Sequence, residues 1–233
     1  MADPFVGVSI VFFLFWVLTL LFSKKTRREQ LLMSIIGLLL APIVLISALA
    51  DVRRGPAEAT SFVGWEDALF VISLFGLASV VYEIFAGRHL ASLREWPWVW
   101  SLRPHPLHWG FKLVLLTSAW VAAVFAILAL MPLRPFSAFV LGGLLVGGYV
   151  LVHRHDLVAN ALASGLLAAV LVFFVEQFFF VRLFPEAAAE IWKMESLSGW
   201  MAGSVPVEEL LWVAVVGFAI GPLYEFVRQK RLK

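Results

Sequence analysis

Long runs of apolar residues follow one another along the chain, separated by short polar segments. A helix needs about 20 predominantly apolar residues to cross the hydrocarbon core of a bilayer, at a rise of about 1.5 Å per residue. The runs are continuous and do not alternate between apolar and polar positions, which favours helices over the strands of a membrane barrel. The pattern therefore predicts seven transmembrane helices, at residues 5–23, 30–50, 66–86, 111–131, 136–152, 157–181 and 208–227.

Acidic pairs stand at the start of two of these predicted helices. Glu66-Asp67 begins an apolar stretch that leads to Tyr82-Glu83, and Glu208-Glu209 begins one that leads to Tyr224-Glu225. The offset is 142 residues at every position, since 208 − 66 and 225 − 83 give the same number. Carboxylates are costly inside a membrane, so their recurrence at matched positions predicts an internally duplicated protein with a polar site between its halves.

The matched helices are the third and the seventh along the chain, which predicts the overall plan. Helices 1–3 and 5–7 would form two three-helix repeats, at residues 1–90 and 135–233, with an interfacial loop and a connector helix in residues 91–134. Because a single helix separates them, both repeats run in the same direction through the membrane. The repeat is therefore parallel, and the two acid pairs are expected on the same face of a single integral membrane domain, residues 1–233.

The composition supports an all-α membrane protein. Hydrophobic residues make up 62% of the chain and charged residues 15%, at a mean hydropathy of +0.93. A soluble domain of this size does not need so much apolar surface. There is no cysteine, which excludes disulfides and thiolate metal sites, and the five histidines all lie near predicted loops, so no metal site is predicted.

The distribution of basic residues predicts the orientation. The first predicted helix has no basic residue before it and four after it, between Lys24 and Arg28, which is the reverse of a cleavable signal peptide, so the helix is expected to be retained. With the N-terminus outside, thirteen Lys and Arg residues fall on the inner side and five on the outer side. This bias predicts a multi-pass protein of the cell membrane with a cytoplasmic C-terminus. The net charge of +2 is thus a topology signal and no sign of nucleic-acid binding.

The acid pairs have a structural explanation as well as a functional one. Proline is favoured in the first turn of a helix, as at Pro206, and acids there are stabilised by the helix dipole. The recurrence of a double acid in both halves argues for more than capping. Consecutive helical residues point about 100° apart, so one acid of each pair can face the bundle while the other caps or faces the interface.

Two further sets of acids also have a structural and a functional explanation. Glu176 lies inside the predicted helix 157–181, where a lipid-facing carboxylate would cost about 2.5–3.5 kcal/mol, so it should face the bundle or a wet cavity. It serves either as a neutral group bonded to another helix or as a functional acid. Glu83 and Glu225 lie near the cytoplasmic helix ends, close enough to Arg88 and Arg228 to pair with them, which favours a structural role.

The segment Pro206-Val207-Glu208-Glu209, with Trp192 before it and Trp212 after it, resembles the Pro-x-Glu-Glu signature of the integral-membrane lycopene cyclase domain family. These small carotenoid cyclases occur as paired subunits in some bacteria and as fused repeats in archaea and fungi. The plan of two three-helix repeats also resembles this family. The chain departs from the pattern in its first copy, where Gly64-Trp65 stands in place of the expected proline.

The resemblance implies redox-neutral cyclisation of the end group of a linear carotenoid or related isoprenoid. A carboxylic acid would protonate the terminal double bond, the carbocation would close on the chain, and a base would remove a proton from the ring. Glu208 or Glu209 would be the proton donor, and Glu66, Asp67 and Glu176 would be the cation stabiliser or base.

The same resemblance indicates where the substrate is expected to bind. The residues expected to line the substrate site are Pro206, Trp192, Trp212, Phe173 and Phe180. No cofactor and no metal are implied. The expected partners are an apolar isoprenoid or carotenoid and the lipid bilayer, with no nucleic acid, and a homo-oligomer is left open.

Two other functions are compatible with the sequence. The fold could serve a non-catalytic protein that binds an isoprenoid or a partner. A glutamate-type intramembrane protease also carries a Glu-Glu pair, but that family expects an arginine shortly after the pair and intramembrane histidines later. Here Leu211 and Trp212 follow the pair, and no histidine lies beyond His155.

Overall fold

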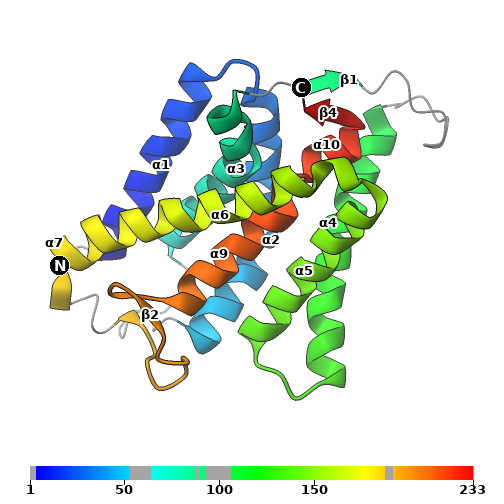
Figure 1. Cartoon of the computed structure of the whole chain (residues 1–233). Coiled ribbons are helices and arrows are strands. Elements are labelled where there is room, and N and C mark those ends of the chain that lie inside the picture. Colours follow the sequence, from blue (N-terminus) through cyan, green and yellow to red (C-terminus); the bar gives the residue numbers. More distant parts are fainter. Residues whose placement is uncertain (1–3, 53–63, 88–89, 93–105, 187–190, 233) are drawn as a thin grey trace.

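The computed structural model describes residues 4–52, 64–87, 90–92, 106–186 and 191–232. Seven long helices lie at the predicted places (Figure 1). They are α1 (Pro4–Phe22), α2 (Arg27–Asp51), α3 (Trp65–Ala86), α4 (Pro106–Leu130), α5 (Pro135–His153), α6 (Val158–Val175) and α9 (Val207–Ile220).

Two of these helices continue in altered form. After α6 the chain turns through a π-helix, η2 (Glu176–Phe180), into the short α7 (Val181–Leu183). A 3₁₀ turn, η1 (His155–Leu157), precedes α6. The second interrupted helix is α9, which ends before Gly221-Pro222 and is followed by α10 (Leu223–Arg228). Proline has no amide hydrogen and cannot continue the helical bond pattern, which accounts for the break between α9 and α10.

The helices have the length and composition of membrane spans. Within the described ranges, six helices are long and apolar enough to cross a bilayer, and the apolar part of α1, Val6–Phe22, is shorter. The prediction of an all-α, multi-pass membrane protein is therefore confirmed. The seventh crossing, the orientation and the repeat stay predictions.

Two central helices organise the packing. α3 packs against α1 and α2, and α9 packs against α5 and α6. The buried share of the apolar window is 61% for the α3 span and 72% for the Val207–Arg228 span, against 17% for the α4 span, which lies at the periphery. Large exposed side chains on α4, such as Phe111 and Phe125, are apolar, as expected of a surface that faces lipid.

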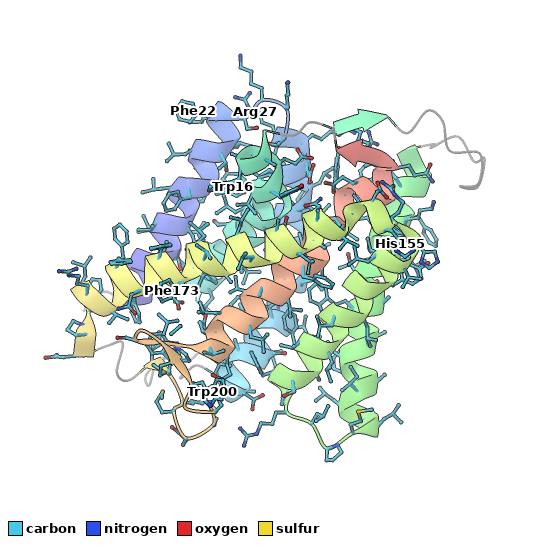
Figure 2. The ribbon with its side chains drawn as sticks, in the orientation of Figure 1. Trp16, Phe22, Arg27, His155, Phe173 and Trp200 are labelled. Carbon is cyan, nitrogen blue, oxygen red and sulfur yellow. The ribbon has the colours of Figure 1, made fainter. Side chains whose placement is uncertain are left out.

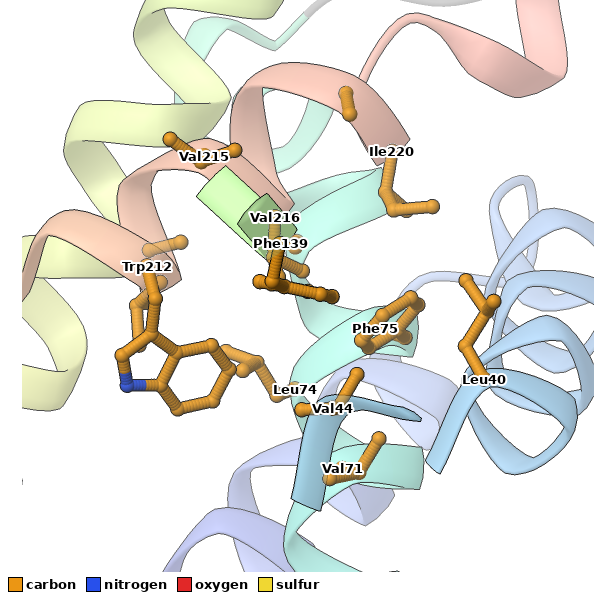
Figure 3. Close-up of a cluster of buried hydrophobic side chains, with 14 of the residues drawn as sticks. Leu40, Val44, Val71, Leu74, Phe75, Phe139, Trp212, Val215, Val216 and Ile220 are labelled. Carbon is orange, nitrogen blue, oxygen red and sulfur yellow. The ribbon is translucent and has the colours of Figure 1, made fainter. Parts of the chain in front are cut away.

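One continuous core joins the two halves of the chain. Figure 3 shows Phe75 of α3 and Leu40 of α2 beside Phe139 of α5 and Ile220 of α9. The halves also meet where α3 contacts α6 and where α2 contacts α5. Glycine permits the closest of the helix contacts, since a Cβ on Gly217 of α9 would lie 2.5 Å from the carbonyl oxygen of Ser164 on α6.

Two short antiparallel strand pairs close opposite ends of the bundle. β2 (Met201–Ala202) and β3 (Val205–Pro206) form a hairpin directly before α9, with Gly203 at a φ of 61° in its turn. β1 (Leu90–Ser92), which follows α3, pairs with β4 (Lys230–Leu232), which follows α10, with Leu90 opposite Leu232. The second pair fastens the end of the first half to the end of the second.

Candidate functional site

Each acid pair begins its helix with one buried and one partly exposed carboxylate. At the start of α3, Glu66 is buried, while Asp67 is partly exposed and accepts a hydrogen bond of 3.2 Å from the backbone N–H of Gly64. At the start of α9, Glu209 is buried and Glu208 is partly exposed. The buried acid is therefore the first of its pair in α3 and the second of its pair in α9.

The glycine in the first copy has a steric reason. The carboxylate of Glu66 folds back over Gly64 and occupies the space that a Cβ at that position would need. No other residue fits there without moving Glu66. The second copy has Pro206 instead, and its buried acid, Glu209, comes one position later.

The loop before α9 lies across the acid-pair end of the bundle. The backbone N–H of Ser198 donates to Oε1 of Glu208 at 2.6 Å, and the N–H of Ser204 donates to Oε1 of Gln177 at 2.7 Å. Lys193 bonds to the last turn of α2 through its own N–H and its Nζ, with the carbonyl oxygens of Val52 and Ala50 as acceptors. Figure 2 shows Trp200 of this loop and Phe173 of α6 at this end, with Phe22 and Arg27 at the other.

Glu176 stands where α6 changes to a π-helix. Its side chain is 1% exposed, so the expectation that it faces the bundle is confirmed. π-helical turns inside α-helices occur frequently at functional sites, because the extra residue redirects the side chains that follow. Here the turn presents Gln177 to the hairpin and places the Phe180 ring edge-on to Trp192, at 6.0 Å between ring centroids.

The predicted substrate residues belong to two aromatic contacts. Trp212 is buried with its ring 6.2 Å from that of Phe70, which in turn lies 4.8 Å from the ring of Phe12. Trp192 and Phe180 form the other contact. Pro206 is buried in β3, and Phe173 is half-buried against its neighbour on α6.

The space between these groups is small in this conformation. Asp67, Phe70 and Trp212 line a pocket together with α2, and its volume is about 10 Å³. A volume of that size holds about one water molecule. The end group of a carotenoid does not fit without a movement of the helices or of the loop.

The opposite end of the bundle holds a second group of acids. Glu29 of α2, Glu83 of α3 and Glu225 of α10 bring carboxylate oxygens within 4.8 Å of one another, and the three residues are 1%, 3% and 0% exposed. Glu225 accepts a hydrogen bond of 2.6 Å from Nδ2 of Asn160, at the start of α6.

This second group corrects the sequence interpretation. Arg228 does not pair with Glu225 as expected; its guanidinium lies over the ring of Trp109, 5.0 Å from the centroid. Arg88 lies outside the described residues. Glu29 was not singled out at all, because it follows two arginines and resembles a solvated helix start. The repeated Tyr-Glu pair was the only signal in the sequence that marked this end.

The comparison with protein families identifies the second half of the chain. Residues 134–227 match the family described as lycopene cyclase. The matched segment runs from α5 to α10 and includes Glu176, Glu208 and Glu209. No curated protein and no solved structure matches the chain. The resemblance seen in the sequence is thus confirmed over this segment, which covers less than half of the chain and is similar to the lycopene cyclase family.

Proposed function

We propose that the chain is a carotenoid cyclase that converts the end group of a linear carotenoid, or of a related isoprenoid, into a ring without net oxidation or reduction. The observation that carries this proposal is the burial of Glu176 and Glu209 inside the segment that matches the family. Both carboxyl groups sit at the end of the bundle that bears the Pro-x-Glu-Glu sequence.

The chemistry needs a proton donor and a base. A carboxyl group among apolar helices retains its proton at neutral pH more readily than one in water, because its ionised form is poorly solvated. We assign Glu209, which is 0% exposed, as the donor to the terminal double bond. The tertiary cation is attacked by the neighbouring double bond, a ring bond forms, and the ring cation loses a proton to a carboxylate. Glu176 or Glu66 takes that proton, so product and substrate are isomers.

The partly exposed acids take a supporting role in this scheme. Glu208 holds the Ser198 amide, and Asp67 holds the Gly64 amide, so both carboxylates are engaged in ordering the backbone around the buried acids. The ring of Trp212 beside Asp67 and Phe70 offers an aromatic face to a carbocation.

The internal duplication supports the same arrangement. α3 lies with α1 and α2 as α9 lies with α5 and α6, and each central helix contributes one buried acid at its start. On this basis residues 1–90 and 135–233 form parallel repeats joined by α4. The basic residues favour a cell-membrane protein with the acid-pair end outside. The polyene would reach this end from the bilayer, by displacing the loop that covers it.

The test is pigment chromatography of lycopene-accumulating cells that express the chain. We expect ringed carotenoids from the unaltered chain and from Glu186→Gln, an exposed acid that serves as the matched control. Glu209→Gln and Glu176→Gln should yield lycopene only. Unchanged lycopene with the folded wild-type protein in the membrane would contradict the proposal and favour a binding role.

A further inference from the structure

We propose that Glu29, Glu83 and Glu225 form a binding site for a hard divalent cation, with Ca²⁺ as the ion that fits best. The three residues come from α2, α3 and α10, and each offers a carboxylate oxygen. Oxygen ligands without nitrogen or sulfur are typical of calcium, magnesium and manganese sites. The site is separate from the acid pairs, and the proposal does not depend on the cyclase reaction.

The oxygen separations are compatible with one shared ion. The three carboxylate oxygens lie within 4.8 Å of one another. Ca²⁺ binds oxygens at roughly 2.3–2.6 Å in a flexible geometry, whereas Mg²⁺ demands a near-ideal octahedron at about 2.0–2.1 Å. Calcium therefore tolerates a wider spread of ligand oxygens than magnesium does, which makes it the ion to test first.

Four of the six carboxylate oxygens have no hydrogen-bond partner among the described residues. Among the described residues, neither oxygen of Glu29 has a hydrogen-bond partner, and one oxygen each of Glu83 and Glu225 has none. Glu29 is 1% exposed, so water at the surface does not solvate it. Burying an ionised carboxylate without compensation costs several kcal/mol, and direct coordination to a cation supplies that compensation.

The charged groups around the three carboxylates leave a net negative charge that a divalent cation would balance. Lys230 interacts electrostatically with Glu29 and Glu83, and Arg154 interacts with Glu225. Arg154 is already engaged in a two-pronged bond to Asp156, at 2.7 and 2.8 Å. Three carboxylates less the charge of Lys230 leave a formal charge of −2, which one divalent cation balances.

A cleft at the surface reaches Glu83, one of the three acids. It has a volume of about 370 Å³, lies between α1 and α3, and is lined by Glu83, Lys25 and the hydroxyl-bearing residues Thr19, Ser23 and Thr26. Ca²⁺ takes about 6–8 oxygen ligands, so several waters would have to complete the shell of three carboxylates. The cleft would let an ion and some of those waters approach the group from the Glu83 side.

Binding would join the two halves of the chain at this end. Glu29 and Glu83 belong to the first half, and Glu225 belongs to the second. A shared ion would hold α2, α3 and α10 together beside the β1–β4 strand pair. We therefore expect calcium to stabilise the folded protein, since a ligand that binds only the native state raises its stability.

The experiment uses the full chain, purified in detergent, with equilibrium binding of ⁴⁵Ca²⁺ and thermal unfolding in calcium or in chelator. We expect one Ca²⁺ per chain and a higher Tm in calcium. Glu29→Gln and Glu225→Gln should weaken binding by at least about tenfold and remove the calcium-dependent rise in Tm, since loss of even an outer-shell partner costs a metal site about 10–100-fold in affinity. Glu186→Gln, the exposed control, should behave as wild type.

Two results would overturn the proposal. One is a folded wild-type chain that binds no Ca²⁺ or Mn²⁺ at millimolar concentration and shows no shift in Tm, which would indicate that the three carboxyls share protons instead. The other is binding that persists unchanged in both glutamine variants. If a glutamine variant does not fold, Glu29→Asp keeps the charge and should retain weakened binding, and the wild-type shift in Tm remains decisive.

Discussion

The two ends of the bundle hold the same kind of side chain in different arrangements. At the acid-pair end the carboxylates are spread over the starts of α3 and α9 and the π-helix, and the partly exposed ones each hold a backbone amide. At the other end three buried carboxylates converge within 4.8 Å. Acids that stand apart can hold different protonation states and act separately, whereas acids that converge must share a proton or a cation.

The largest expected effect is the difference in cyclisation activity between a substitution at the acid-pair end and one at the opposite end. Glu209→Gln should lower cyclisation by about 10²–10⁴-fold, because the amide cannot donate the proton in the transition state. Glu225→Gln, at the other end, should leave the chemical step intact in whatever fraction of the protein is folded. The measurement is ringed product per amount of folded protein in membranes. Equal losses in both variants would erase the distinction between the two ends.

Gly64→Ala tests the first acid pair. The added methyl group overlaps the far end of the flexible Glu66 side chain, so we expect the carboxylate to be displaced and cyclisation to fall, with little change in stability. Gly148→Ala is the matched control, because a Cβ there would meet no atom within 4 Å. The comparison is made on ringed product per amount of folded protein. Equal activity of the two variants would show that cyclisation does not depend on where the Glu66 carboxylate lies.

Asn160→Ala tests the converged acids. The substitution removes the donor to Glu225 at 2.6 Å, and an unsatisfied buried acceptor costs about 1–3 kcal/mol. Ser79→Ala is the control, since the hydroxyl of this buried serine bonds within its own helix, to the carbonyl oxygen of Gly76. Thermal unfolding of both variants gives the difference. An Asn160→Ala variant as stable as Ser79→Ala would mean that Glu225 does not need this donor.

The smallest expected effect concerns the loop over the acid pairs. Gln177→Ala removes the acceptor for the Ser204 amide, a bond at the protein surface whose loss should cost about 0.5–1.5 kcal/mol locally. Hydrogen exchange at Ser204 should become faster, with little change in global Tm. Unchanged exchange would show that the hairpin is held by other contacts.

The helices were predictable because their signal is local. Continuous apolar runs located all seven, and the acid pairs correctly marked the starts of α3 and α9. The break at Gly221-Pro222 and the π-helix at Glu176 were not predicted. The π-helix is a shift of one residue in the hydrogen-bond pattern, which leaves no mark in hydropathy. Gly221-Pro222 is a recognisable helix-breaking signal, but the apolar run that continues on both sides of it obscures the break.

The converged acids were beyond sequence reasoning because they depend on packing between distant segments. Glu29 begins α2 beside two arginines, and nothing local distinguishes it from a solvated residue. It becomes buried only where α2 packs beside α3 and α10, which brings it next to Glu83 and Glu225. The strands β1 and β4 have three residues each, too few for a periodic pattern to appear.

The most direct test of the proposed chemistry is to incubate the purified chain with lycopene in liposomes made with D₂O, without a reductant or nucleotide. Acid–base cyclisation predicts ringed product that carries one deuterium for each ring formed and otherwise keeps the mass of lycopene. Ringed product without deuterium, product whose mass shows a gain or loss of hydrogen, or no product from folded protein would contradict it.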